Sequence, residues 1–256
     1  MTYQVVIFDG ESERQQFDAR ISRGRTIRTW LARVCQVWRW WVAEEIHSDY
    51  VDRRIRFGCA GSEMVLCWPR QKKRAKADPV VETMTEVAEC LGLCVIRSAA
   101  RPADLLATAA SARGQRTALI VSDHPAALQF ATDHIPRLHV LAGKIRKTPS
   151  SIFQDLGVWP SDIPAYLSLV GCRQERVKRK LAPAGARAAL TARDRKVKPL
   201  RPVKGVPVGS SGWRRKTVAP DLARLRRLAL GVGGADVLQP DLWSLAQCVA
   251  RSSVFV

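Results

Sequence analysis

Short apolar runs alternate with segments of helical periodicity along the first 141 residues of the chain. Gly, Pro, Asp or Ser bounds each run, which is typical of buried β-strands. The predicted strands span residues 3–8, 63–68, 93–97, 117–122 and 137–141. The segments between them, where apolar residues recur at helical spacing, predict helices over residues 26–46, 79–91, 102–113 and 125–132. This alternation predicts an α/β fold with a mostly parallel central sheet and flanking helices.

The pattern changes after residue 141, where we expect helices only. The predicted helices span residues 150–156, 162–170, 173–192 and 216–230. A stretch rich in Pro, Gly and Lys, residues 196–212, predicts an extended basic loop. We therefore expect three parts, which are an α/β core over 1–145, a basic helical subdomain over 146–235 and a C-terminal tail over 236–256.

The charge of the chain is strongly unbalanced. It contains 42 Lys and Arg residues against 23 Asp and Glu residues, a formal net charge of +19. Residues 173–227 contain 18 of the basic residues and three of the acidic ones, so they account for 15 of the 19 net charges. A local surplus of this size makes a nucleic acid the expected partner, with an anionic membrane surface as the alternative.

We expect the protein to be neither membrane-spanning nor secreted. No run of 18 apolar residues occurs, and no leader-like segment precedes the first predicted strand. The seven cysteines form no C-x-x-C pair and mostly lie in apolar surroundings, which is typical of reduced core thiols. We expect a cytoplasmic, nucleoid-associated protein without a membrane partner.

Acidic residues follow the predicted strands at the edge where a parallel sheet forms its functional crevice. Asp9 and Asp123 come directly after strands, and Asp104 lies in the first turn of the helix that follows residues 93–97. Carboxylates gathered at such an edge are the usual ligands of Mg²⁺. Each of them also suits a helix N-terminus, where a carboxylate accepts backbone N–H groups. These residues alone leave both interpretations open.

Five segments, in their order along the chain, resemble motifs of the 5′-nuclease family, which comprises the 5′→3′ exonuclease domain of bacterial DNA polymerase I and the flap endonucleases. The segments are VIFDG at 6–10, RPADL at 101–105, ALIVSDHPAAL at 118–128, FQDLGVWPSDIPAYLSLVG at 153–171 and LAPAGARAAL at 181–190. They are similar in turn to the family patterns V-D-G, E-A-D-D, G-D-K-D, Y-G-V-x-P-x-x-I-x-D-Y and G-x-G-x-K-T-A. The resemblance covers roughly residues 3–235 and implies a 5′-nuclease, PIN-like fold with a helix-hairpin-helix-type motif in the basic subdomain.

The sequence departs from the family at most of its metal-binding carboxylates. The resemblance leaves four candidate metal ligands, which are Asp9, Asp104, Asp123 and Glu175. The other expected positions hold Trp68, Pro102, Leu105, Pro125 and Cys172. Two Mg²⁺ ions held close together need dense carboxylates, and Arg173 and Arg176 make this crevice less negative. We expect at most one Mg²⁺ or Mn²⁺, weakly bound, and we assign no catalytic residue.

The nucleic-acid-binding residues are expected mainly in the basic subdomain. A hairpin with Gly185 in its turn would let backbone N–H groups approach a phosphate, and Arg187 would add a charged contact. The other candidates there are Arg173, Arg176, Lys178, Arg179, Lys180, Arg193, Arg214, Arg215 and Lys216. A second basic run, with Arg70, Lys72 and Lys73, occupies the place of the family's basic arch but is short. Contacts of this kind bind the backbone without sequence preference. The alternative is a merely solvated charged face.

Three functions follow from these residues. We favour a nucleic-acid-binding protein of the 5′-nuclease fold that holds branched or junction DNA with little or no catalysis, within a replication or DNA-processing assembly. The second function is a divergent Mg²⁺- or Mn²⁺-dependent 5′→3′ exonuclease or flap endonuclease. The third is an RNA-processing or RNA-binding PIN-like protein, because backbone contacts alone do not separate DNA from RNA.

Overall fold

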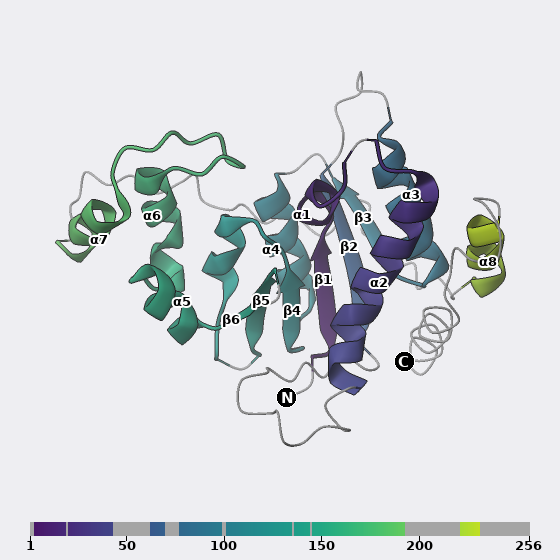
Figure 1. Ribbon diagram of the computed structural model, residues 1–256. Helices are drawn as coiled ribbons and strands as arrows, with labels where there is room; N and C mark the ends of the chain where they lie inside the picture. Colours follow the sequence, from purple (N-terminus) through teal and green to yellow (C-terminus); the bar gives the residue numbers. More distant parts are fainter. Residues whose placement is uncertain are drawn as a thin grey trace.

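A six-stranded sheet forms the centre of the computed structural model (Figure 1). The structure describes residues 3–18, 20–42, 62–69, 77–98, 101–134, 136–143, 145–192 and 221–230. The strands are β1 (Val5–Asp9), β2 (Glu63–Pro69), β3 (Cys94–Ser98), β4 (Ala118–Val121), β5 (Leu138–Ala142) and β6 (Ile145–Lys147). They lie in the order β3-β2-β1-β4-β5-β6, and all neighbours are parallel except β5 and β6. The predicted α/β class with a mostly parallel sheet and the five predicted strands are confirmed, whereas the helix-hairpin-helix-type motif stays a prediction.

Helices cover both faces of the sheet. Successive side chains of a strand point to opposite faces, and here both sets are apolar and are buried beneath helices. Val6 and Phe8 of β1 belong to one core, and Val5 and Ile7 belong to the other. The first core is completed by α2 (Arg23–Val42), α3 (Pro79–Cys90) and α8 (Leu222–Leu230). The second is completed by α4 (Pro102–Ala112), η2 (Pro125–Phe130), α5 (Pro149–Leu156), α6 (Ile163–Val170) and α7 (Pro183–Thr191). Burial on both faces explains why the strands read as continuous apolar runs.

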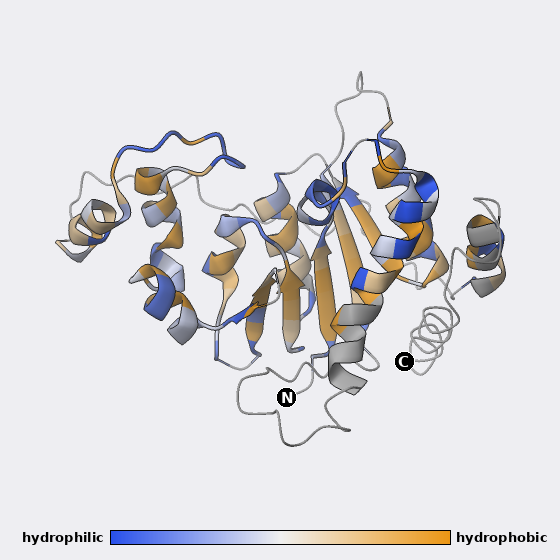
Figure 2. Ribbon diagram, in the orientation of Figure 1, coloured by the Kyte–Doolittle hydropathy of each residue, from blue (hydrophilic) through white to orange (hydrophobic). Residues whose placement is uncertain are grey.

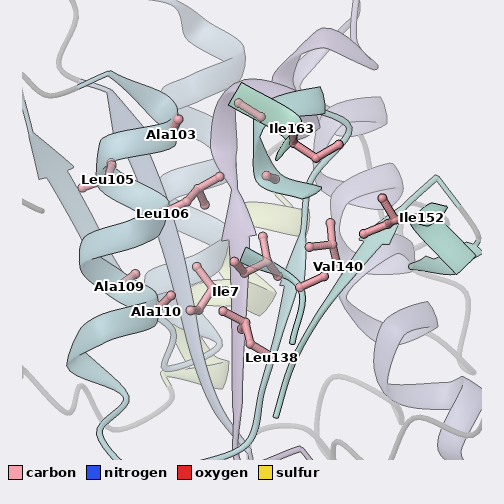
Figure 3. Packing of buried hydrophobic residues seen from close by; sticks show 14 of the residues in the cluster. Ile7, Ala103, Leu105, Leu106, Ala109, Ala110, Leu138, Val140, Ile152 and Ile163 are labelled. Atoms are coloured by element: carbon pink, nitrogen blue, oxygen red, sulfur yellow. The ribbon is translucent and has the colours of Figure 1, made fainter. Parts of the chain in front are cut away.

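The second core lies between β1, β5 and the helices of that face. Figure 3 shows Ile7, Leu106 and Val140 converging there, with Ile152 and Ile163 reaching in from α5 and α6. The central strands are accordingly coloured mostly as hydrophobic in Figure 2, whereas the helices contain both hydrophobic and hydrophilic residues. Contacts with β1, β2 and β4 hold α4 against this face of the sheet.

Proline and a capping side chain set the start of several helices. Pro79 begins α3, where Asp78 accepts a hydrogen bond from the backbone N–H of Val80 at 2.9 Å. Pro149 begins α5, where Thr148 and Ser151 form a capping box. The helix expected over residues 125–132 is present as a 3-10 helix, η2. The missing N–H of proline costs nothing in a first turn, which is why these starts are readable from sequence.

Two short elements depart from the sequence-based expectation. Residues 10–15 form a helix, α1 (Gly10–Gln15), although their side chains are almost all polar. The strand β6 contradicts the expectation of helices only after residue 141. Its three residues are too few to establish a hydrophobic period, and Ile145 is exposed because β6 lies at the edge of the sheet.

The helix predicted over residues 173–192 is wrong for its first ten residues, because α7 begins only at Pro183. Residues 172–182, which we call the basic arm, instead form a tight turn followed by extended chain. The backbones of Cys172 and Val177 exchange two hydrogen bonds, at 3.0 and 2.9 Å. Proline disrupts a helix interior, and like charges one turn apart repel, so both features favour the arm over a helix.

The last described helix, α8, lies beside α3 (Figure 1). The backbone N–H of Asp221 donates to the carbonyl of Cys90 at 2.9 Å, and Leu225 is buried in the first core. None of the helices in the described ranges has the length and apolarity needed to span a bilayer. The predicted division into core, subdomain and tail stays a prediction.

Candidate functional site

Asp9 lies at the carboxyl end of β1 and is buried. Its Oδ2 accepts hydrogen bonds from the hydroxyls of Ser12 at 2.7 Å and Ser122 at 2.6 Å. Its Oδ1 accepts from the backbone N–H groups of Glu11 at 3.2 Å and Ser12 at 3.4 Å, so Asp9 caps α1. Donors from the chain itself therefore surround this candidate metal ligand.

An arginine that the sequence analysis did not single out joins two further candidates. Arg101 donates two hydrogen bonds to the carboxylate of Asp104, from Nε at 2.7 Å and from Nη2 at 2.9 Å. Its Nη1 donates to Glu175 Oε2 at 3.2 Å. The side chains of Asp104 and Glu175 are only 13% and 9% exposed, so this cation is their counter-ion within the protein. The signal in the sequence is an arginine directly before Pro102, at the start of the helix that carries Asp104.

His124 contributes to the same cluster. Its Nδ1 accepts a hydrogen bond from the backbone N–H of Ala126 at 3.1 Å, and its Nε2 lies 3.4 Å from Glu175 Oε1. A neutral ring that accepts at Nδ1 carries its proton at Nε2, and among the described residues this N–H makes no hydrogen bond although Glu175 lies close to it. Burial lowers the pKa of His124, although Asp9 and Glu175 oppose this shift. The ring is therefore neutral near pH 7.

Asp123, the remaining candidate ligand, is exposed and follows β4. Its Oδ1 accepts from the backbone N–H of Gly143, at 2.5 Å, in the turn between β5 and β6. Its own backbone N–H donates to Ser12 Oγ at 3.2 Å. Asp123 thus holds this turn beside the hydrogen-bond network of Asp9.

Trp68 occupies a position where the family resemblance implies a carboxylate. Its side chain is 2% exposed and belongs to the first core. A methyl group added at Gly10 would lie 2.4 Å from the indole ring, so only glycine fits there. The position is filled by close-packed apolar surface that offers a cation no oxygen.

These side chains do not fit a divalent metal ion. Within the described ranges, no three His, Cys, Asp or Glu side chains lie together as metal ligands. Asp104 and Glu175 share one guanidinium, and Asp9 is held by hydroxyl and amide donors. The single weakly bound Mg²⁺ or Mn²⁺ expected from the sequence stays a prediction.

The basic arm presents its positive charge to solvent. Its exposed basic residues are Arg173, Arg176, Lys178, Arg179 and Lys180. The backbone N–H of Lys180 donates to the carbonyl of Leu169 at 2.8 Å, which fixes the arm against the end of α6. Gly171, with φ of 86°, directly precedes the arm. It lets the backbone of Arg179 pass close by, because a Cβ at Gly171 would lie 2.8 Å from that backbone. Figure 2 shows the arm as a mostly hydrophilic ribbon beside α6 and α7.

The structure places Gly185 and Arg187 differently from the hairpin expectation. Gly185 lies in the first turn of α7 and not in a turn between helices. Arg187 Nη1 donates to the carbonyl of Leu156 at 3.4 Å, and its side chain packs over Gly157 at the end of α5. Arg187 therefore joins α7 to α5, and its contact with phosphate stays a prediction.

Several candidates lie outside the described residues. They are Arg70, Lys72, Lys73, Arg193, Arg214, Arg215 and Lys216. Their assignment to nucleic-acid binding stays a prediction based on the sequence.

A buried acid on α1 was also not predicted. Glu13 is 2% exposed and pairs with Arg33 of α2 at 3.3 Å. Burial raises the pKa of Glu13 to about 7, although Arg33 lowers it, and the negative charges of Asp123 and Asp9 add to the rise. Arg33 also donates to the carbonyl of Gly143, at 3.3 Å, in the turn that Asp123 holds.

We expect Glu13 to make stability depend on pH. Its folded pKa, about 7, lies above its ordinary value of 4.5, so protonated Glu13 favours the folded state. This contribution is complete below about pH 4.5 and is lost as the pH rises through about 7, an effect on the order of 3 kcal/mol. Urea unfolding of wild type and Glu13→Gln should show the variant gaining relative stability between pH 5 and pH 8. Replacing the exposed Glu82 with Gln is the control. An equal difference between wild type and Glu13→Gln at both pH values would contradict the assignment.

The mostly parallel six-stranded sheet and its flanking helices match a fold of the 5′-nuclease type. A structure of the T5 5′-exonuclease with zinc ions bound matches 99% of this chain and 100% of that chain, with a TM-score of 0.50 and 10% sequence identity. A structure of the bacteriophage T5 D15 flap endonuclease in a pseudo-enzyme–product complex with DNA and metal ions covers the same shares, with a TM-score of 0.49 and 8% identity. No protein-family model and no curated protein sequence matches the chain. At this identity the likeness shows the fold, and function has to be argued from the site.

Proposed function

We propose that the protein binds the phosphate backbone of nucleic acid, branched or junction DNA above all, and hydrolyses it little or not at all. The observation that best supports this proposal is the exposure of all five basic residues of the basic arm, Arg173, Arg176, Lys178, Arg179 and Lys180. Cations held together on one ordered segment attract a polyanion by releasing its counter-ions. Such a surface recognises charge and spacing, so we expect no base preference.

The start of α7 supports the same proposal. The arm leads directly into this helix, and its first residues, from Pro183 to Gly185, are exposed. The residue before the helix, Ala182, supplies no side-chain cap. Backbone N–H groups at a helix N-terminus attract phosphate, and here they lie next to the cations of the arm.

The carboxyl edge of the sheet supports weak or absent hydrolysis. In-line displacement at a phosphodiester requires stabilisation of both the attacking and the leaving oxygen. Here Arg101 engages Asp104 and Glu175, and serine hydroxyls engage Asp9, so these carboxylates are directed at groups of the chain itself. We place the protein in a replication or DNA-processing assembly in the cytoplasm, where it would hold substrate for other components.

Removing charge from the arm tests the proposal. The variant Lys178→Ala, Arg179→Ala, Lys180→Ala should bind a fluorescent junction DNA more weakly. The negative slope of the logarithm of the association constant against the logarithm of the salt concentration should become less steep by about three, one for each cation removed. The matched control replaces three exposed arginines elsewhere, Arg20, Arg25 and Arg137, and removes the same net charge. Equal losses in the two variants would assign binding to overall charge and contradict a role for the arm.

A further inference from the structure

We propose that Arg101 is a built-in cation that takes the place of a divalent metal ion between Asp104 and Glu175 and thereby ties the basic arm to α4. The inference rests on the proposed function only in treating the arm as the binding surface. Its basis is one guanidinium within hydrogen-bond distance of two carboxylates that come from separate parts of the chain, 74 residues apart in the case of Glu175.

The geometry of the pair with Asp104 fixes the position of the cation. Nε and Nη2 meet the two carboxylate oxygens of Asp104 in a fork, at 2.7 and 2.9 Å, and this orients Nη1 toward Glu175. Hydrogen bonding to Asp104 raises the pKa of Arg101 above its already high ordinary value, so the guanidinium stays charged. A divalent ion bridging the same carboxylates would have to displace this cation.

The surroundings of Glu175 also oppose a metal ion. The Nε2 of His124, which carries the proton when Nδ1 accepts from Ala126, lies 3.4 Å from Glu175 Oε1, and a nitrogen that carries a proton cannot coordinate a metal. The ring therefore acts as a polar neighbour of the carboxylate and not as a ligand. Arg101 donates to Oε2 of Glu175, and His124 Nε2 lies near Oε1 without a hydrogen bond to it.

Glu175 has a second role because it belongs to the basic arm. It is the single acidic residue of residues 172–182, and it is also less exposed than the basic residues around it. Its ion pair with Arg101 joins the turn of the arm to the first turn of α4. The acid points inward to the cation, and the basic residues on either side of it remain in solvent. Arg101 is thus a positioning residue for the arm.

Manganese binding by the full-length protein tests the substitution directly. We expect Arg101→Met to remove the cation shared by two neighbouring carboxylates and to bind Mn²⁺ about 10- to 100-fold more tightly than wild type, measured by electron paramagnetic resonance of free Mn²⁺. Arg101→Lys, which keeps the charge, should show no such gain. The control is Arg116→Met, which removes the arginine paired with one carboxylate, Glu63, at the amino end of β2. Wild type and Arg101→Met binding Mn²⁺ equally would overturn the proposal.

Two further measurements keep the proposal testable if Arg101→Met folds poorly. Wild type should keep the same thermal midpoint in EDTA and in Mn²⁺, since an ion that bound the folded state would raise it. Hydrogen exchange should show faster opening of the arm in Glu175→Gln than in wild type. A higher thermal midpoint of wild type in Mn²⁺ would contradict the replacement of a metal ion by Arg101. An unchanged exchange rate of the arm in Glu175→Gln would contradict its positioning by Arg101. Neither measurement involves nucleic acid, so they are independent of whether the arm binds DNA.

Discussion

Raising the salt concentration from 50 to 200 mM is expected to weaken binding to junction DNA by about 10³- to 10⁵-fold. This range corresponds to about six to ten phosphate contacts, each of which releases a counter-ion from the DNA. The basic arm supplies five exposed cations, and residues 173–227 as a whole have a surplus of 15 positive charges. Fluorescence anisotropy with a labelled junction at several salt concentrations measures the slope.

Sequence scrambling is the control for the salt titration. Junctions of the same geometry and different base sequence should give the same affinity and the same slope, because phosphate contacts contain no sequence information. A dissociation constant that changes less than about tenfold across the salt range would mean few phosphate contacts and would contradict an electrostatic interface.

Cleavage of a 5′-flap substrate in Mg²⁺ or Mn²⁺ is expected to be absent or slower than ordinary enzymatic turnover, about 1 to 10³ s⁻¹, by several powers of ten. The physical reason is the occupation of the carboxylates: Arg101 engages Asp104 and Glu175, and serine hydroxyls engage Asp9. A single-turnover assay with excess protein measures the chemical step without product release. Binding of the same substrate, measured in parallel, shows whether the protein in the assay is folded and able to bind DNA.

The variant Asp9→Asn distinguishes residual activity from contamination. Any trace cleavage that is unchanged in this variant does not come from the crevice. Cleavage at an ordinary turnover that Asp9→Asn abolishes would establish the metal-dependent nuclease instead, as would a crystal structure in Mn²⁺ with two ions about four ångströms apart.

The sequence predicts the elements that are long, apolar and bounded by turn residues. The strands β1, β2 and β4 are buried on both faces, so their composition alone reveals them. Local pattern fails for α1, which owes its start to the side chain of Asp9, and for β6, which is three residues long. It fails also at the arm, where Pro183 and closely spaced like charges interrupt a pattern that otherwise indicates a helix.

The candidate site was predictable in its positions but not in its pairing. Asp9, Asp104 and Asp123 do lie at the carboxyl edge, as parallel strands require. The partner of Asp104 and Glu175 comes from a loop before α4, and no spacing rule connects residues 101 and 175. Pairing of this kind depends on tertiary structure. The sequence therefore indicates where a carboxylate lies, but it does not identify the cation that neutralises it.

A guanidinium that is part of the chain differs from a metal ion in its availability. The entropy of placing Arg101 beside Asp104 and Glu175 is lost once, when the protein folds, and the cation does not exchange with the surrounding solution. A chelator cannot remove it, and the supply of magnesium in the cell does not change its occupancy. It also has no coordination position in which water could become a hydroxide nucleophile. The positive charge between Asp104 and Glu175 is therefore independent of the metal ions in solution.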